Sequence, residues 1–184
     1  MELTISILAF VVSFATFLFT VLVTYRGEQR QKKQATLDAL NILQEQVFDN
    51  LNMYTFADVR NVATQWQLSI QAKNRFINDK QGTADEFWNT HHEYDSVIEE
   101  YRKLSGYLAR IEHFALGVNT GIYDAKVTER AATTYFVMLY KKMGPILAVK
   151  NNGTPTALEL KNEYHTEFSA LVERIQKIES KSSY

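Results

Sequence analysis

A long segment without formal charge, near the start of the chain, is the feature that most limits how this protein can fold. Residues 3–25 read LTISILAFVVSFATFLFTVLVTY and lie between Glu2 and Arg26. A helix rises about 1.5 Å per residue and the hydrocarbon core of a bilayer is about 30 Å thick, so a helix of this length can span it. Because an isolated segment has no barrel to join, only a helix satisfies its backbone groups in lipid. We therefore expect a transmembrane anchor over residues 1–25.

The residues flanking this segment predict that it is retained and predict its orientation. A cleaved secretory signal begins with basic residues and ends in a small-x-small site, whereas this chain begins Met1-Glu2 and leaves the segment through VTYR. Four basic residues follow it, namely Arg26, Arg30, Lys32 and Lys33. The positive-inside rule then predicts a single-pass protein of the cell inner membrane, with its N-terminus outside and its C-terminal domain in the cytoplasm. We expect the four basic side chains to contact anionic lipid headgroups.

Small and hydroxylated residues recur along one face of the predicted anchor. They follow each other at steps of three or four: Ser6, Ala9, Ser13, Thr16 and Thr20. Small residues let helices approach closely in lipid, and hydroxyl groups can bond across the contact, so this stripe predicts a homo-oligomer. The alternative is that each hydroxyl bonds to the carbonyl one turn earlier and faces lipid.

The charge and cysteine content exclude several classes of function. Of the 21 acidic residues only Glu2 precedes Arg26, so the remainder of the chain is formally neutral, with 20 acidic and 20 basic residues. Outside the four juxtamembrane residues the basic side chains are dispersed, and we expect no nucleic-acid partner. The absence of cysteine excludes disulfides, thiolate catalysis and cysteine-ligated metal sites.

Beyond the anchor, apolar residues recur at helical spacing, and no segment alternates with a period of two. We expect residues 26–57 to form a juxtamembrane amphipathic helix that continues the anchor, because Gly27 permits a bend without requiring a break. Residues 58–184 are expected to form a cytoplasmic helical domain. The predicted fold class is all-α: a single N-terminal transmembrane helix continuing into an antiparallel bundle of four or five helices.

Turn and capping residues predict the helix boundaries in that domain. Asp58 is expected to cap one helix, and residues 78–82 (NDKQG) to form a loop. Thr83 and Glu86 form a capping box that starts a helix running to about Asn119, with a break near residues 105–106. Asp124 is expected to cap the next helix, which Gly144-Pro145 kinks and whose predicted core face is Val127, Ala131, Tyr135, Met138, Leu139, Ile146 and Leu147. A loop at residues 150–153 and a capping box at residues 156–159 then precede a last helix with the core residues Tyr164, Phe168, Leu171, Ile175 and Ile178.

Motifs for catalysis, cofactors and metals are absent from the sequence. None of the four histidines begins an H-E-x-x-H or closes a Glu-x-x-His pair, and neither phosphate-binding glycine loop occurs. His91 and Asp95 lie one helical turn apart, which could hold a metal or shuttle a proton, but a solvated helix face explains the same spacing. We therefore expect no catalytic, cofactor or metal residue.

Glu112 is the one carboxylate expected to be partly buried. It lies beside the apolar stripe of Leu108, Ile111 and Ala115, and a buried carboxylate requires a partner. The expected partner is a cation on another helix, Arg130 or Lys142. Such an inter-helix ion pair fixes helix register without any catalytic role.

Residues 107–124 read YLARIEHFALGVNTGIYD and resemble the core of a family. This is a bacterial domain-of-unknown-function group of small membrane-anchored helical proteins with an approximate core L-N-x-x-E-x-x-A-x-G-I-x-x-G-I-Y-D. The matching residues are Leu108, Glu112, Ala115, Gly117, Gly121, Ile122, Tyr123 and Asp124. Ala109 replaces the usual asparagine, and Met138 and Lys141 replace polar and acidic residues of the following helix. The resemblance implies a fold and a membrane location, and no activity.

The GIYD element at residues 121–124 also has a physical interpretation. Gly121 permits a tight turn, Ile122 and Tyr123 are expected to cover the ends of two helices, and Asp124 caps the second helix. A partner-binding role for Tyr123 and Asp124 is the alternative.

Two functions from different classes are consistent with these features. The first is a non-enzymatic, membrane-tethered interaction module, an adaptor or sensor that binds an unidentified protein partner and self-associates through its transmembrane helix. The second is an oligomerising effector of a stress or antiviral defence system that perturbs the inner membrane. An atypical hydrolase using His91, Asp95 and Glu112 is the least favoured alternative.

Overall fold

The computed structural model describes the backbone of residues 2–150 and 165–182 and the side chains of residues 13–150 and 165–177. Over these residues all regular structure is helical and no strand occurs, which confirms the all-α prediction. The elements in chain order are α1 (Glu2–Leu43), a π-helical turn (Gln44–Phe48), α2 (Asp49–Asn52), α3 (Phe56–Asn78), α4 (Ala84–Thr90), a 3₁₀ turn (His92–Tyr94), α5 (Asp95–Asn119), α6 (Ala125–Lys150) and α7 (Thr166–Ser182).

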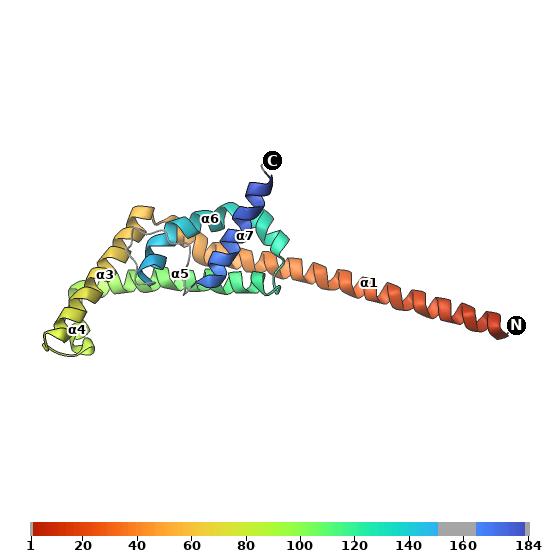
Figure 1. Ribbon diagram of the computed structural model, residues 1–184, viewed down its shortest axis with the longest axis horizontal. Helices are drawn as coiled ribbons and strands as arrows, with labels where there is room; N and C mark the ends of the chain where they lie inside the picture. Colours follow the sequence, from red (N-terminus) through yellow and green to blue (C-terminus); the bar gives the residue numbers. More distant parts are fainter. Residues whose placement is uncertain (1, 151–164, 183–184) are drawn as a thin grey trace.

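Helix α1 is a continuous rod whose two halves have different surroundings. It passes Gly27 without a break, as expected, and its N-terminal half projects from the bundle (Figure 1). Its C-terminal half belongs to the bundle, where Thr36, Leu40 and Leu43 are buried. None of the helices, over the residues whose side chains are described, contains an apolar run long enough to cross a membrane. Residues 3–12 of the predicted anchor lie outside that part.

Capping boxes form the N-terminal ends of α3 and α4. The predicted box of Thr83 and Glu86 is confirmed: Glu86 N–H donates to Thr83 Oγ1, and Thr83 N–H donates to Glu86 Oε2 at 2.7 Å. The prediction that Asp58 caps α3 is wrong by one turn. Thr55 is the cap and Asp58 is its partner in a second box. In the sequence, an aspartate at the start of a helix looks the same whether it is the cap residue or the third residue of a capping box.

The helix predicted from Thr83 to Asn119 is interrupted, but not where glycine suggested. The chain passes through residues 105–106 without a break and turns instead at His91, which ends α4. Gly106 is tolerated because its neighbours Leu104 and Leu108 are fully buried and hold the helix in place. The C-terminal end is confirmed, since Gly121 closes α5 with φ of 81°.

The first half of α6 is rotated relative to the predicted core face. Ala131, Tyr135 and Met138 are exposed, which contradicts their assignment to the core. The buried positions begin instead at Thr128, whose hydroxyl group donates to the Asp124 carbonyl, and continue through Ala132 and Phe136, Leu139, Tyr140 and Met143. A search for apolar residues at helical spacing does not include a threonine, even where that threonine is buried. The predicted Leu139, Ile146 and Leu147 are buried, and α6 continues past Pro145 to Lys150.

The core is shared by the C-terminal half of α1 and helices α3, α5, α6 and α7, which pack side by side (Figure 1). Phe168, Leu171 and Ile175 of α7 are buried, as predicted for the last helix. The predictions for residues 151–164, including Tyr164, and for the side chain of Ile178 lie outside the described residues. The bundle therefore positions one face of α5 against α7 and another face against α1.

Candidate functional site

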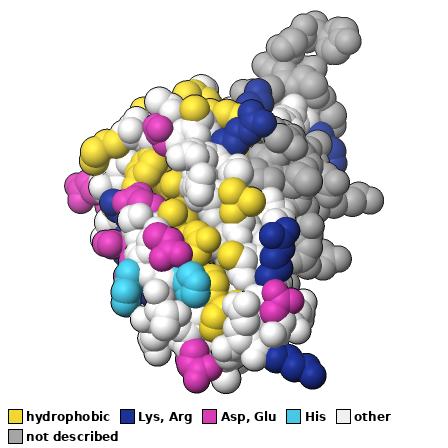
Figure 2. All heavy atoms as spheres, turned by 90° about the vertical axis from the view of Figure 1, so that its left-hand side faces the viewer, with side chains coloured by type: hydrophobic (Ala, Val, Ile, Leu, Met, Phe, Trp, Pro, Cys, Tyr) yellow, Lys and Arg dark blue, Asp and Glu magenta, His cyan; other side chains and the backbone are white. Residues whose placement is uncertain are grey.

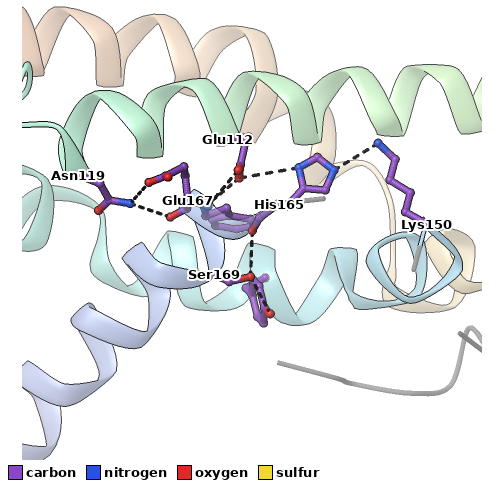
Figure 3. A network of polar contacts seen from close by, with 8 residues as sticks. Glu112, Asn119, Lys150, His165, Glu167 and Ser169 are labelled. Atoms are coloured by element: carbon purple, nitrogen blue, oxygen red, sulfur yellow. Dashed lines mark hydrogen bonds and ion pairs between the residues drawn. The ribbon is translucent and has the colours of Figure 1, made fainter. Parts of the chain in front are cut away.

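Glu112 lies on the face of α5 that meets the start of α7, where it caps that helix (Figure 3). Its Oε1 accepts the backbone N–H of Glu167 at 3.0 Å, and its Oε2 accepts that of Phe168 at 2.8 Å. The first N–H groups of a helix have no partner within the helix and attract a negative charge. Glu112 therefore supplies from another helix the acceptor that a local cap residue usually supplies.

The cation expected to pair with Glu112 does not do so. Lys142 donates to the carbonyl of Leu51 at 3.0 Å, and Arg130 is exposed. The prediction was wrong because it considered only charged side chains, whereas the partner is the backbone of a helix N-terminus. The partial burial of Glu112 is confirmed, with 21% of its side chain exposed.

His165 precedes α7 and lies between Glu112 and Lys150 (Figure 3). Its Nε2 is 3.3 Å from Lys150 Nζ, and its buried Nδ1 is 3.8 Å from Glu112 Oε2, without a hydrogen-bond partner. Desolvation, followed by the positive charge of Lys150, lowers the pKa of His165 to about 4, and desolvation also lowers the pKa of Lys150. The imidazole is therefore neutral at pH 7, and with Lys150 as donor to Nε2 its proton is on Nδ1.

Further polar contacts attach α7 to its neighbours. Asn119 Nδ2 donates to the carbonyl and to Oε2 of Glu167, and Ser169 Oγ donates to the His165 carbonyl and contacts Tyr140 Oη. The network thus joins the ends of α5 and α6 to the start of α7. Because both oxygens of Glu112 already accept backbone N–H groups, the arrangement favours a structural role for that carboxylate over acid–base chemistry.

The connector at residues 119–124 places Tyr123 and Asp124 as the sequence suggested. Asp124 Oδ1 accepts the N–H groups of Lys126 and Val127, which confirms it as the cap of α6. Its own N–H donates to Thr36 Oγ1 at 2.7 Å, so the connector is also attached to α1. Tyr123 turns inward and stacks on Phe114 with ring centroids 5.1 Å apart. Ile122, expected to cover helix ends, is instead 67% exposed.

Tyr123 also lines a groove between α1 and α5. The groove has a volume of about 460 Å³ and is lined by Ala39, Ile42, Leu43, Gln46, Ala109, Arg110, His113, Phe114 and Tyr123. Arg110 donates to Gln46 Oε1 at 3.1 Å across it. The groove could receive an apolar group beside a positive charge. Sequence reasoning missed it because its two walls are far apart in the chain.

A second hollow lies at the end of the bundle opposite the N-terminal rod. It has a volume of about 510 Å³ and is lined by Trp66, Trp88, Asp95, Ile98, Glu99 and Arg102. Trp66 stacks on Tyr101 at 4.4 Å and lies parallel to Trp88 at 6.2 Å. Figure 2 looks onto this end, where a band of hydrophobic side chains runs between acidic and basic ones. This aromatic cluster was not predicted from the sequence, because its rings come from three helices, α3, α4 and α5.

The residues considered for hydrolysis are not brought together. His91 stacks on Phe87 with centroids 4.1 Å apart, and it is His92 that contacts Asp95, at 3.1 Å on the surface. Asp95 and Glu112 lie on one helix, about 25 Å apart along its axis at the usual rise. Among the described residues no group of three histidine or acidic side chains could hold a metal ion.

The residues assigned to the membrane lie on the projecting half of α1 and just beyond it. Ser13, Thr16 and Thr20 are exposed, and Thr20 Oγ1 donates to the Thr16 carbonyl, the local bond that the lipid-facing alternative predicts. Ser6 and Ala9 lie outside the described side chains. Arg26, Arg30 and Lys33 are exposed, and Lys32 is half-buried beside the connector.

Comparison with known proteins identifies a family. The sequence model of a domain of unknown function (DUF4760) matches residues 3–174, nearly the whole chain. This confirms the expected membership of a family of unknown function. No curated protein and no solved structure matches the chain.

Proposed function

The chain belongs to the DUF4760 family, and we propose that it is a non-enzymatic, membrane-tethered interaction module. In this proposal residues 3–25 anchor the chain in the cell inner membrane. The helical body is held on the cytoplasmic side, where it binds a protein partner. Copies of the chain associate through the membrane-embedded part of α1.

The observation that carries the proposal is the exposure of large apolar side chains on the projecting half of α1. Between residues 14 and 25 the exposed fractions run from 45% to 68%, and the residues concerned are Phe14, Phe17, Leu18, Phe19, Val21, Leu22, Val23 and Tyr25. Water disfavours so large a contiguous apolar surface, whereas lipid matches it. Residues 13–25 span about 20 Å as a helix, and the uncharged sequence back to Leu3 extends this to about 35 Å, enough for a bilayer core.

The continuity of α1 supports self-association. Successive residues of a helix are about 100° apart, and α1 has no break between the stripe and the bundle. On this basis Ser13, Thr16 and Thr20 lie roughly 170° around the helix from Thr36, Leu40 and Leu43, which face the bundle. The helical body of one copy therefore does not obstruct a second copy of α1 that packs on its stripe.

The membrane location is tested by extraction and by topology. We expect the full chain to sediment with membranes after a carbonate wash and to require detergent for release. The double variant Leu18→Arg/Leu22→Arg should move to the soluble fraction, and Leu68→Arg, at an exposed position of α3, should not. Since the chain lacks cysteine, Glu2→Cys and Lys103→Cys can be labelled separately in intact cells with an impermeant maleimide. Labelling of position 2 alone is expected; a carbonate-soluble wild-type chain refutes the anchor, and labelling of position 103 refutes the orientation.

Self-association is tested by disulfide crosslinking in membranes. Thr16→Cys and Thr20→Cys should form dimers, whereas Leu18→Cys and Leu22→Cys, on the opposite side of α1, should stay monomeric. Equal crosslinking at all four positions indicates random collision and contradicts the stripe.

A further inference from the structure

Ile122 is an apolar side chain displayed on the surface by a tight turn. The reversal at Gly121, with φ of 81°, lets only one of the next two side chains turn inward, and Tyr123 takes that place against Phe114 and Gly117. Ile122 is left 67% exposed, more than any other described isoleucine, leucine or valine. Among the described residues, an isoleucine so exposed is only weakly packed against the bundle.

The connector that carries Ile122 lies where α1 leaves the bundle (Figure 1). Asp124 N–H donates to Thr36 Oγ1, and Lys32 Nζ lies 3.9 Å from the position that a Cβ at Gly121 would occupy. Lys32 is seven residues beyond Tyr25, which places it about 10 Å along α1 from the end of the apolar segment. Each interfacial layer of a bilayer is about 5–8 Å thick, so an upright α1 leaves the connector about 2–5 Å beyond that layer, and a tilt of α1 toward the connector closes this gap.

The cations at the end of the bundle that carries Ile122 match an anionic surface. Exposed or half-buried cations on this end of the bundle come from two helices, α1 and α6: Arg26, Arg30, Lys32, Lys33, Lys126 and Arg130. The neighbouring acids are mostly occupied, because Asp124 caps α6 and Glu129 pairs with Arg174. On α1, Glu28 and Asp38 are exposed acidic residues, and Asp38 accepts a hydrogen bond from Gln34.

We propose that the connector at residues 119–124 is a second membrane contact, in which Ile122 enters the interface of an anionic bilayer while Lys32 and Lys126 bind headgroup phosphates. This inference rests on the proposed anchoring by residues 3–25. Insertion of apolar side chains and attraction of lysines to anionic headgroups are the two terms by which proteins attach to such lipid surfaces. Two contacts fix the rotation of α1 about its own axis, which one helix alone leaves undetermined.

The test uses single-cysteine variants of the full chain, labelled with an environment-sensitive fluorophore and reconstituted in vesicles. Ile122→Cys reports on the connector, Val21→Cys on the proposed span, and Met138→Cys, an exposed position about 20 Å further along α6, on the body. Vesicles contain either neutral lipid or about one-third phosphatidylglycerol, each with and without a lipid that carries a quencher near the headgroup. We expect the label at position 122 to shift to the blue and to be quenched at least twofold more in anionic vesicles, and the label at position 138 to be unaffected.

The outcomes separate the inference from its premise. Quenching at position 21 without quenching at position 122 overturns the second contact and leaves the anchor in place, and it then favours a protein partner for Ile122. Quenching at neither position overturns both. Lys126→Glu and Lys32→Glu in the Ile122→Cys background should return the label to water, whereas Lys73→Glu, at the far end of the bundle, should not. If Lys32→Glu and Lys126→Glu leave the fluorescence and quenching of the label at position 122 unchanged, lipid charge does not hold the connector at the surface.

Discussion

The carboxylate of Glu112 on α5 accepts the backbone N–H of Phe168 in the first turn of α7, with 2.8 Å between oxygen and nitrogen. It also accepts the N–H of Glu167, 55 residues later in the chain, so one side chain caps a helix that is distant in the sequence. Replacing Glu112 by alanine leaves two N–H groups at the helix start without their acceptor. We expect a loss of about 1.5–3 kcal/mol in the free energy of unfolding, measured by urea denaturation in detergent.

Glu112→Gln separates the charge from the hydrogen bond, because it keeps one acceptor oxygen. Its expected loss is about half that of the alanine variant, and hydrogen exchange at residues 167–171 should accelerate in both. Glu99→Ala, which removes an exposed carboxylate of the same helix, is the control and should be neutral within about 0.5 kcal/mol. An alanine variant at position 112 as stable as the control shows that α7 does not depend on this cap.

His165 makes the stability of the protein depend on pH in the acid range. The folded-state pKa is about 4, below the ordinary value of 6.5, because burial and Lys150 oppose protonation. Between these two values the unfolded chain binds more protons than the folded one, so stability falls as pH decreases from about 6.5 to about 4. Among the described residues, the titratable groups facing His165 are Glu112 of α5 and Lys150 of α6.

The measurement compares urea midpoints between pH 7 and pH 4 for wild type and His165→Gln. The variant should lose distinctly less stability over this range, whereas the exposed control His92→Gln should follow wild type. Carboxylates such as Asp58 and Glu86, whose pKa values are lowered by their capping bonds, titrate in all three chains and cancel in the comparison. Parallel curves for all three chains contradict the assignment to His165.

The features predicted correctly from the sequence are those set by neighbouring residues. The capping box of Thr83 and Glu86, the cap at Asp124 and the positive φ of Gly121 depend on contacts within four residues, and the structure confirms each of them. The core positions of α7 were also predicted, because its apolar residues keep one helical spacing throughout.

The features predicted wrongly depend on contacts between distant segments. The partner of Glu112 is the backbone of α7, and the residues near position 112 in the sequence do not indicate this contact. The face of α6 is set by the attachment of Asp124 to Thr36, so Thr128 is buried and Tyr135 is exposed, against their polarity. The break at His91 follows its stacking on Phe87, an arrangement that the spacing of His91 and Asp95 does not reveal. Local sequence patterns predict where the helices lie, whereas contacts between distant segments determine which face of a helix is buried.

Two glycines of α5 should respond in opposite directions to the same substitution. A Cβ at Gly117 would lie 2.5 Å from the ring of Tyr123, whereas a Cβ at Gly106 would meet nothing within 4 Å. Gly117→Ala should therefore cost about 1–3 kcal/mol by overpacking, and Gly106→Ala should gain about 0.5–1 kcal/mol from helix propensity. Thermal unfolding of both variants and of wild type measures these two changes in stability. Tyr123→Ala should make the further change Gly117→Ala nearly neutral, and a penalty that persists shows that the ring is not its cause.

Thr36 and Thr128 offer a matched pair for the attachment of α1 to the connector. Both are fully buried, and both donate their hydroxyl to the carbonyl four residues earlier, Lys32 and Asp124 respectively. Only Thr36 also accepts a hydrogen bond, from the buried N–H of Asp124. Thr36→Val keeps the shape and leaves that N–H without an acceptor, which should cost about 1–3 kcal/mol, whereas Thr128→Val should cost less than about 1 kcal/mol. Thr36→Ser restores the acceptor and should recover most of the loss in urea denaturation. Equal losses for the two valine variants contradict a specific role for the Thr36 hydroxyl in holding the connector on α1.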